Sequence, residues 1–433
     1  MSRLAHLTSQ GESIQEKSGT RTAADLPLPA PRAPLVARGR RQKTGPGGPL
    51  GMGRGPRGVY VHVPFCLHKC HYCDFYSIAG DGDGGRRDRR GVFVQRLIEE
   101  IRASSAFLGP PIETTFFGGG TPTLLPSGLW KILLAALSDH QPRAADHELT
   151  VEANPETVDE PLMEALVAGG VNRLSIGAQS FDPRHLKTLE RRHDPARVVR
   201  SVQIARRGGI ANINIDLIFG IPGQTLEQWL EDLQEVLALE PTHLSCYALS
   251  YESNTPLTAK LRAGRIKRID QDLEARMYEV VIDRLAAAGF EHYEISSWAR
   301  PGRRCRHNLR YWRNDQWWPL GPAAAGHVAG VRWKNVPHLG RYLREGPLPA
   351  ITDVERLDED GRIGEELMLR LRLIEGIECG LLQRLLAAGV RGRERGVAIM
   401  RHTDAGNLER SSGRLRLTRR GLLVADSVLA DLL

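Results

Sequence analysis

Three cysteines lie close together in the first quarter of this 433-residue chain, at a spacing suited to metal–sulfur chemistry. Cys66, Cys70 and Cys73 belong to the stretch VYVHVPFCLHKCHYCDFYS and have C-x3-C-x2-C spacing. Three thiolates this close together can bind three irons of a cube of four irons and four sulfides, which leaves the fourth iron open to a small molecule. The spacing differs from the C-x2-C-x2-C run of ferredoxins that only carry electrons. The pattern therefore indicates a centre that also binds a ligand.

Two other uses of these thiols stay open. A structural zinc site needs a fourth ligand, which a side chain near the cysteines would have to supply: His62, His68, His71 or Asp74. A disulfide would leave one of the three thiols over, and the remaining cysteines are scattered singly: Cys246, Cys305 and Cys379. Scattered cysteines are typical of a reducing compartment, so we expect a soluble, cytoplasmic protein.

Other polar motifs each follow an apolar run: GGGTP (118–122), EANPE (152–156), GAQSF (177–181) and DLIFGIPGQT (216–225). Glu152 and Asp216 stand in otherwise apolar strands, where an unpaired carboxylate is costly, so each should face a polar partner. Gln179 can donate and accept hydrogen bonds, as ribose hydroxyls require, and Arg191 can pair with a ligand carboxylate. Taken singly, each of these side chains is better explained by an internal salt bridge or a cap.

Apolar runs of strand length alternate with amphipathic stretches from residue 58 onward. The strand-like runs are 59–63, 113–117, 148–153, 172–178, 212–219 and 243–249, and the helical stretches are 92–106, 128–137, 161–168, 196–207 and 226–239. This alternation predicts an α/β fold with parallel strands and crossover helices. A partial (β/α)6 TIM-like barrel is favoured over a doubly wound sheet, because a barrel brings all the strand ends and their motifs to one mouth.

A further group of side chains lies outside the barrel pattern, after a predicted helix at 269–287 and a strand at 292–296. The segment is loop-rich by its pattern and contains HNLRYW, that is His307, Asn308, Tyr311 and Trp312, with His327 nearby. A neutral imidazole with aromatic neighbours suits a haem-type macrocycle, through axial ligation or packing on its face. The alternative is a core-facing aromatic segment with a hydrogen-bonded histidine.

The ends of the chain differ in composition from the barrel. Residues 1–57 hold ten Lys or Arg and three Asp or Glu, so this tail carries +7 of the net charge of +8. The tail is rich in Pro, Gly and Arg, which predicts disorder, with an organelle transit peptide as the alternative. No apolar run approaches the roughly 18 residues that span a bilayer.

Residues 348–433 form the third predicted unit, after the tail (1–57) and the barrel with its aromatic segment (58–347). Short helices at 364–371 and 380–388, a hairpin near 411–413 and a final helix at 420–432 resemble a winged helix. Its arginines are expected on a solvated face, and we expect no nucleic-acid partner, because the body of the chain is nearly neutral.

With these residues quoted, the chain from about Val59 onward resembles the radical S-adenosylmethionine superfamily. The cysteine motif and GGGTP are shared across the superfamily, whereas SIGAQSF, NIDLIFGIPGQT and HLSCYALSYESNTPL are similar to one branch. That branch contains oxygen-independent coproporphyrinogen III oxidases of porphyrin biosynthesis and haem chaperones of the HemW type.

The resemblance implies a 4Fe–4S cluster on the three cysteines and S-adenosylmethionine at its open iron. Carried over by position, the residues for this cofactor are Tyr60, Tyr72, Gly119, Gly120, Thr121, Glu152, Gln179, Arg191, Asp216 and Ala248. Of these, Glu152 and Arg191 would meet the methionine end, Gln179 and Asp216 the ribose, and Tyr72 the adenine.

Two features favour the chaperone side of the branch. In the oxidases a further cysteine follows two residues after the third, and here that position is Phe75. The HNxxYW motif resembles the one associated with haem binding, which assigns His307, Asn308, Tyr311 and Trp312 to haem.

The implied partners are haem and haem-accepting proteins such as membrane respiratory enzymes, with a homodimer left open. The alternative is radical oxidative decarboxylation of coproporphyrinogen III. The run PLGPAAAGHVAG departs from relatives and leaves the role of His327 open.

Overall fold

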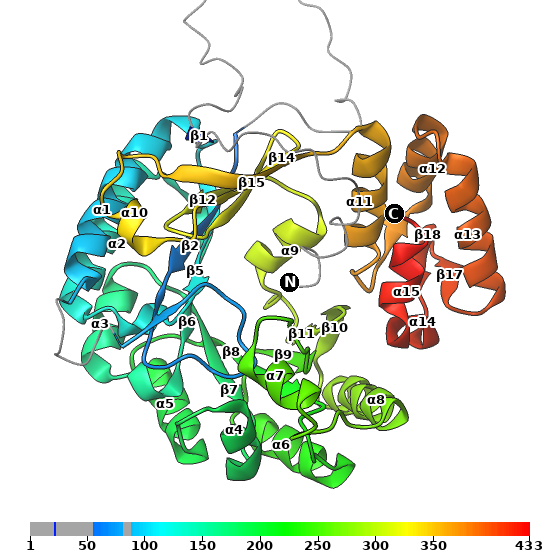
Figure 1. Ribbon diagram of the computed structural model, residues 1–433, viewed down its shortest axis with the longest axis horizontal. Helices are drawn as coiled ribbons and strands as arrows, with labels where there is room; N and C mark the ends of the chain where they lie inside the picture. Colours follow the sequence, from blue (N-terminus) through cyan, green and yellow to red (C-terminus); the bar gives the residue numbers. More distant parts are fainter. Residues whose placement is uncertain (1–20, 23–54, 81–87) are drawn as a thin grey trace, which may run out of the picture.

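The computed structural model describes residues 21–22, 55–80 and 88–433. A curved sheet with parallel strands in its middle forms the centre of the molecule (Figure 1). The prediction of a disordered tail over 1–57 falls almost wholly outside the described residues. The neighbouring strands β2 (Gly58–Val63), β5 (Ile112–Gly119), β6 (Arg143–Ala153), β7 (Arg173–Gln179), β8 (Asn212–Phe219) and β9 (His243–Ala248) are all parallel. The predicted α/β fold with a partial barrel is confirmed.

Crossover helices cover the outside of these strands. They are α1 (Arg90–Ser104), α2 (Ser127–His140), α3 (Glu160–Ala168), α5 (Pro195–Arg207), α6 (Leu226–Ala238) and α8 (Gln271–Ala287). Alternate strand residues face these helices, and Phe117 meets Trp130 of α2 edge to face at 4.9 Å between ring centroids. Burying each such side chain contributes about 2–3 kcal/mol. The other strand residues are largely polar and line the inside of the barrel.

Several helices on the barrel begin with an aspartate followed by a proline in the first turn. Asp159, Asp182 and Asp194 accept hydrogen bonds from backbone N–H groups at the start of α3, α4 (Pro183–Leu189) and α5. Proline costs little there, because its missing N–H would have no partner inside the helix. These caps fix where each loop at the barrel mouth ends.

The aromatic segment after residue 300 is not loop-rich as predicted. It forms α9 (Arg306–Trp312) and the strands β12 (Trp317–Leu320), β13 (Ala325–Val328) and β14 (Val331–Asn335). β12 pairs in parallel with β2 and so adds a seventh parallel strand, and β13, β14 and β15 (Ala350–Arg356) continue antiparallel. The prediction was wrong because WWPL and AGHV are too short to show strand periodicity.

Both edges of the sheet carry antiparallel strands. β1 (Arg21–Thr22) pairs with β15 at one edge, and β11 (Ser297–Ala299) and β10 (Glu291–Glu294) follow β9 at the other. Figure 1 shows α9 between the barrel strands and the C-terminal helices.

The C-terminal helices surround a core of their own. They are α11 (Glu359–Arg370), α12 (Cys379–Ala388), α13 (Gly392–Asp404), α14 (Arg419–Leu423) and α15 (Ala425–Ala430), with a small sheet of β16 (Ile377–Glu378), β18 (Arg414–Leu417) and β17 (Leu408–Ser411). The predicted final helix is two short helices that meet at Val424. Leu309 and Trp312 of α9 belong to this core, which ties α9 to it. The division at residue 348 stays a prediction, and β15 lies in the large sheet.

Among the described residues, no helix is long and apolar enough to cross a membrane.

Candidate functional site

The three predicted cysteines lie at the carboxyl end of β2, and all six cysteines of the chain are free thiols. Cys66 ends the short strand β3 (Phe65–Cys66), and its Sγ lies 3.6 Å from Oγ1 of Thr121 in the GGGTP turn. Nη1 of Arg191 lies 3.7 Å from Sγ of Cys70. The structure therefore brings Thr121 and Arg191, predicted for one ligand, to the cysteines predicted for the cluster.

Backbone hydrogen bonds join the cysteine loop to two short helices, α4 and α7 (Pro256–Arg262). The backbone N–H of His71 donates to the carbonyl of Leu189 at the end of α4, and the N–H of Leu257 in α7 donates to the carbonyl of His71 at 2.9 Å. Tyr72 packs on a small apolar cluster that contains Leu189 and Leu257. The loop is thereby fixed to elements far along the chain.

Burial and neighbouring charges act differently on the three thiols. Burial raises the pKa of Cys73 to about 12 and raises that of Cys66. Burial also acts to raise the pKa of Cys70, but the imidazole of His68 and the guanidinium of Arg191 bring it below its ordinary value. Iron binding would deprotonate all three thiols.

The GGGTP turn approaches β2 and β3 so closely that only glycine fits. Gly119 has φ +105°, and a Cβ there would lie 2.4 Å from the ring of His62. A Cβ on Gly120 would lie 2.6 Å from the carbonyl of Phe65. The N–H groups of Gly120 and Thr121 donate to the carbonyls of Val63 and Phe65, so the turn is held close against the strands that lead to the cysteines.

The two predicted carboxylates point into the barrel from β6 and β8. Glu152 accepts a hydrogen bond from the N–H of Gly119 at 3.2 Å, and burial, helped by the Asp216 charge, raises the pKa of Glu152 to about 8. Asp216 accepts from Asn214 Nδ2 at 2.8 Å and from Ser175 Oγ at 3.1 Å. Burial raises the pKa of Asp216 above its usual range. Glu152 can therefore take up or release a proton near neutral pH, and an ammonium group beside it would favour its ionised form.

Gln179 and Arg191 flank the same mouth. Gln179 ends β7 in the left-handed region, with φ 69°, where a register shift re-aims the strand. Nη2 of Arg191 donates to the carbonyl of Gly177 at 2.5 Å, while its buried Nε has no partner. An unpaired buried donor of this kind suits a ligand carboxylate.

Tyr60 and Ala248 complete the predicted set. The hydroxyl of Tyr60 lies 3.2 Å from Nδ1 of His62, and its ring stacks on Phe116 at 6.3 Å between centroids. Ala248 is exposed at the end of β9. The donor set therefore fits the implied group: three free thiols, a close glycine turn, a guanidinium N–H without a partner and two half-buried carboxyls.

The predicted haem residues lie on α9, and His307 faces the inside of the barrel. His307 is buried, its Nδ1 lies 2.9 Å from Oγ1 of Thr114 and its Nε2 lies 2.9 Å from the hydroxyl of Tyr311. Its ring stacks on Phe116 at 5.4 Å. Both ring nitrogens are therefore engaged, as in a hydrogen-bonded core histidine, and burial lowers the pKa of His307 to about 3.

Asn308, Trp312 and His327 each contact a different part of the structure. Asn308 Nδ2 donates to Oε1 of Glu294 at 3.4 Å. Trp312 is buried in the C-terminal core, under the guanidinium of Arg372. His327 lies 3.1 Å through Nδ1 from the carbonyl of Asp315 and contacts the ring of Trp317. The structure thus brings only His307 and Tyr311 of the HNxxYW set into direct contact.

The zinc alternative concerns a single metal ion. In the part of the chain that the structure describes, no group of three or more His, Cys, Asp or Glu side chains is placed to hold one.

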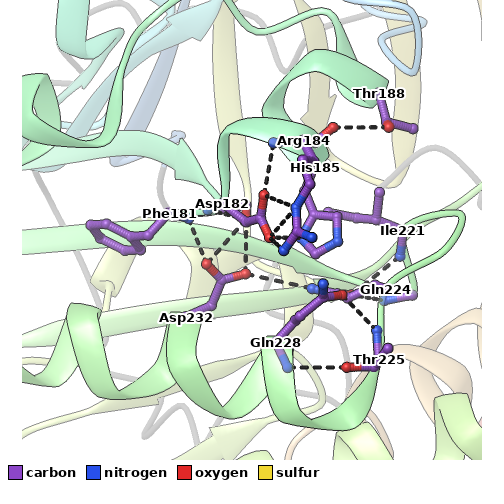
Figure 2. A network of polar contacts seen from close by, with 12 residues as sticks. Phe181, Asp182, Arg184, His185, Thr188, Ile221, Gln224, Thr225, Gln228 and Asp232 are labelled. Carbon is purple, nitrogen blue, oxygen red and sulfur yellow. Dashed lines mark hydrogen bonds and ion pairs between the residues drawn. The ribbon is translucent and has the colours of Figure 1, made fainter.

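The sequence did not predict a hydrogen-bonded network around Asp232, called the Asp232 clasp below (Figure 2). The buried carboxylate of Asp232 in α6 accepts from Ser180 Oγ at 2.8 Å and from the N–H of Phe181 at 2.5 Å. It also lies 3.5 Å from Nε2 of Gln224, whose Oε1 accepts from the N–H of Gly220 at 2.9 Å. The one available signal was an aspartate on the apolar face of an amphipathic helix.

Comparisons with known proteins agree with this geometry. The model of the radical SAM superfamily matches residues 60–236. The haem chaperone HemW of Mycobacterium tuberculosis is 39% identical over 380 residues, which cover 87% of this chain and 95% of that protein. The chain belongs to the HemW branch of the radical SAM superfamily. HemW of Escherichia coli K12 is 37% identical over 327 residues, covering 74% of this chain and 83% of the relative.

This chain is also similar to a mouse protein and to a solved structure. The mouse mitochondrial radical S-adenosyl methionine domain-containing protein 1 is 35% identical over 337 residues, covering 77% of this chain and 72% of the relative. The solved coproporphyrinogen III oxidase HemN of Escherichia coli superposes with a TM-score of 0.73 over 88% of this chain and 90% of that one, at 22% identity. This likeness shows a shared fold. The superfamily implies a 4Fe–4S cluster and S-adenosylmethionine.

Proposed function

We propose that this protein is a cytoplasmic haem chaperone that binds a 4Fe–4S cluster, S-adenosylmethionine and haem. It transfers haem to a recipient protein, such as a membrane respiratory enzyme. The observation that carries the proposal is the 39% identity to a haem chaperone over 95% of that protein's length. The HNLRYW motif on α9 supports it from the residues.

Each residue set has a distinct task in this proposal. Cys66, Cys70 and Cys73 hold the cluster, and the bound S-adenosylmethionine supplies one-electron chemistry when the cluster is reduced. Glu152 and the GGGTP turn receive the amine, and the unpaired Nε of Arg191 receives the carboxylate. Asp216, already held by Asn214 and Ser175, presents its oxygens to the ribose.

Haem binding on α9 requires a local rearrangement. Because both ring nitrogens of His307 are hydrogen-bonded, this imidazole could hold haem iron only if one of its partners, such as the Tyr311 hydroxyl, moved away. The freed hydroxyl can then donate to another acceptor. Haem binding should therefore depend on both side chains.

A haem titration tests the proposal. We expect the purified protein to bind haem, with H307A and Y311A each weakening binding about tenfold or more while iron and sulfide content stays unchanged. H140A, at the half-buried C-terminal end of α2, is the matched control and should bind as the wild type does. Haem binding that is indifferent to both α9 changes would refute the assignment to this segment.

An anaerobic assay addresses the enzymatic alternative. The HemN fold match favours coproporphyrinogen III as a second candidate ligand, while Phe75 occupies the position of the fourth cysteine of the oxidases. We expect no protoporphyrinogen from coproporphyrinogen III with a strong reductant and S-adenosylmethionine. Turnover in this assay would make the protein an oxidase.

A further inference from the structure

One buried arginine inside the barrel has no counter-charge in direct contact. Arg173, at the start of β7, is 2% exposed, and among the described residues its guanidinium makes no hydrogen bond or ion pair. An arginine does not lose its proton in a protein. The charges of Glu148 and Asp216 act on Arg173 without a hydrogen bond to it, and its buried Nε has no partner.

A second orphaned donor lies beside it. Thr150 is fully buried and its Oγ1 has no partner. Thr150 pairs with Arg173 across β6 and β7, so the two side chains point to the same face of the sheet. The residues that flank them, Leu149, Val151 and Leu174, pack in the main core toward the helices. Thr150 and Arg173 therefore point into the barrel.

The chain itself shows how a buried arginine is normally satisfied. Arg395 in α13 is also fully buried, but its guanidinium donates to the carboxylate of Asp360 at 2.9 Å and to the carbonyls of Leu432 and Leu433. Arg173 has an equal number of donors and none of these acceptors.

Acidic groups that face Arg173 are engaged elsewhere. Glu148 accepts from the backbone N–H groups of Arg306 and His307 at 3.0 Å each, which caps α9. Asp216 accepts from Asn214 and Ser175. The other titratable groups that face the guanidinium are Cys305, Tyr293, Glu152, His243 and His307.

The strand register fixes where Thr150 and Arg173 lie relative to the other site residues. Glu152 and Ser175 lie two residues further along β6 and β7, toward the mouth. His307 of α9 lies on the other side, bonded to Thr114 on the neighbouring strand β5. A guanidinium fork and a hydroxyl thus face a region that touches both the cofactor residues and α9.

We propose that Thr150 and Arg173 form a buried anion subsite inside the barrel, built to receive a carboxylate group. The planar fork of arginine matches a carboxylate with two parallel hydrogen bonds, and the hydroxyl adds a third donor. The carboxylate comes either from a propionate of haem, in which case the inference rests on the proposed function, or from a small free acid.

Carbon-13 formate is the probe for the subsite itself. Its NMR line should broaden saturably with the wild-type protein. We expect formate to bind about tenfold or more weakly to R173Q, and roughly two- to tenfold more weakly to T150V, than to the wild type. R207Q on the exposed face of α5 is the matched control and should behave as the wild type does. If R173Q does not fold, T150V and R173K, which keeps the charge without the fork, carry the test. No saturable broadening with wild type, or equal broadening with R173Q, would mean that water alone satisfies the guanidinium and would overturn the proposal.

A comparison of haem with its dimethyl ester identifies the source of the carboxylate. If a propionate occupies the subsite, wild-type protein binds haem more tightly than the ester, and R173Q removes the difference. Equal binding of the two by the wild type assigns the subsite to a free acid. Failure of both to bind would count against the haem-chaperone proposal, while the formate result would still decide the subsite.

Discussion

At the residue scale, the mouth of the barrel brings together half-buried polar groups that have few partners in the protein. Glu152 and Asp216 share one polar interior, and their mutual repulsion and burial keep the pKa of Glu152 at about 8. The orphaned Nε of Arg191 and the close GGGTP turn lie beside them. These groups are better suited to a charged ligand than to one another.

The Glu152 pKa predicts a pH dependence of S-adenosylmethionine binding. An ammonium group binds the ionised carboxylate, so affinity should rise as pH increases from about 6 toward 8, where the free carboxyl loses its proton. E152Q should bind more weakly, by about tenfold, and lose this slope. Equilibrium binding at fixed ionic strength measures both, and an unchanged slope in E152Q would contradict the assigned role.

A substitution in the GGGTP turn tests its close packing. In G119A the Cβ would collide with the ring of His62 at 2.4 Å and the residue would need φ +105°, so we expect a loss of about 1–3 kcal/mol in unfolding free energy and of cofactor binding. G128A on α2, where a Cβ meets open space, is the control and should be neutral or slightly stabilising. Denaturant unfolding monitored by circular dichroism gives both values.

Many of the site residues could be predicted from the sequence because their motifs are local. The cysteine spacing and the motif after each strand carry Cys66, Glu152 and Asp216. Arg173 and Thr150 could not be found in this way, since their isolation depends on where Glu148 and α9 lie in the folded barrel. The structure also shows both nitrogens of His307 engaged, which the HNLRYW motif does not reveal.

At the element scale, the loops at the mouth depend on clasps between neighbouring units. Asp232 of α6 joins the loop after β7 to the loop after β8, which Figure 2 shows as one hydrogen-bonded network. Gln179 ends β7 directly before this network. The clasp therefore positions a predicted ribose-binding side chain.

The Asp232 clasp predicts how stability changes with pH. Burial raises the pKa of Asp232 to about 6, above the value of about 3.9 in an unfolded chain. The contribution of the protonated carboxyl to the unfolding free energy is therefore fully present below pH 4 and is lost as pH rises through 6. Between pH 4 and 7 the wild type should therefore lose unfolding free energy relative to D232N, by at most roughly 3 kcal/mol. Denaturant melts at several pH values measure this difference, and a constant difference would refute the shifted pKa.

The strands and helices of the barrel were predictable because apolar periodicity is a local signal. The run 212–219 coincides with β8, and 196–207 differs from α5 by one residue. The seventh parallel strand β12 and the helix α9 were missed, because short elements rich in tryptophan are specified by tertiary packing. The division of the final helix at Val424, where the backbone leaves the helical region at φ −121° and ψ 24°, was also missed.

At the scale of the whole molecule, α9 connects two cores. Its inner face carries His307 against the barrel strand β5, and its outer residues Leu309 and Trp312 lie in the C-terminal core. A change in the C-terminal core should therefore be felt at the proposed haem segment.

The variant L367A tests this connection. Leu367 of α11 is fully buried in the C-terminal core, so its truncation should cost about 2–5 kcal/mol. Hydrogen exchange should increase in α9 as well as in α11, with the strands β6 and β7 less affected. V397A, on the exposed side of α13, is the control. Faster exchange confined to the C-terminal helices would contradict the coupling.

The central claim is a 4Fe–4S cluster bound by only three protein thiolates, with its fourth iron open to S-adenosylmethionine. Anaerobic reconstitution followed by iron and sulfide analysis and electron paramagnetic resonance tests it most directly. We predict one four-iron cluster per chain whose reduced spectrum changes when S-adenosylmethionine is added, and its loss in C66A, C70A or C73A. Zinc in place of iron, or a cluster spectrum that ignores S-adenosylmethionine, would contradict the account.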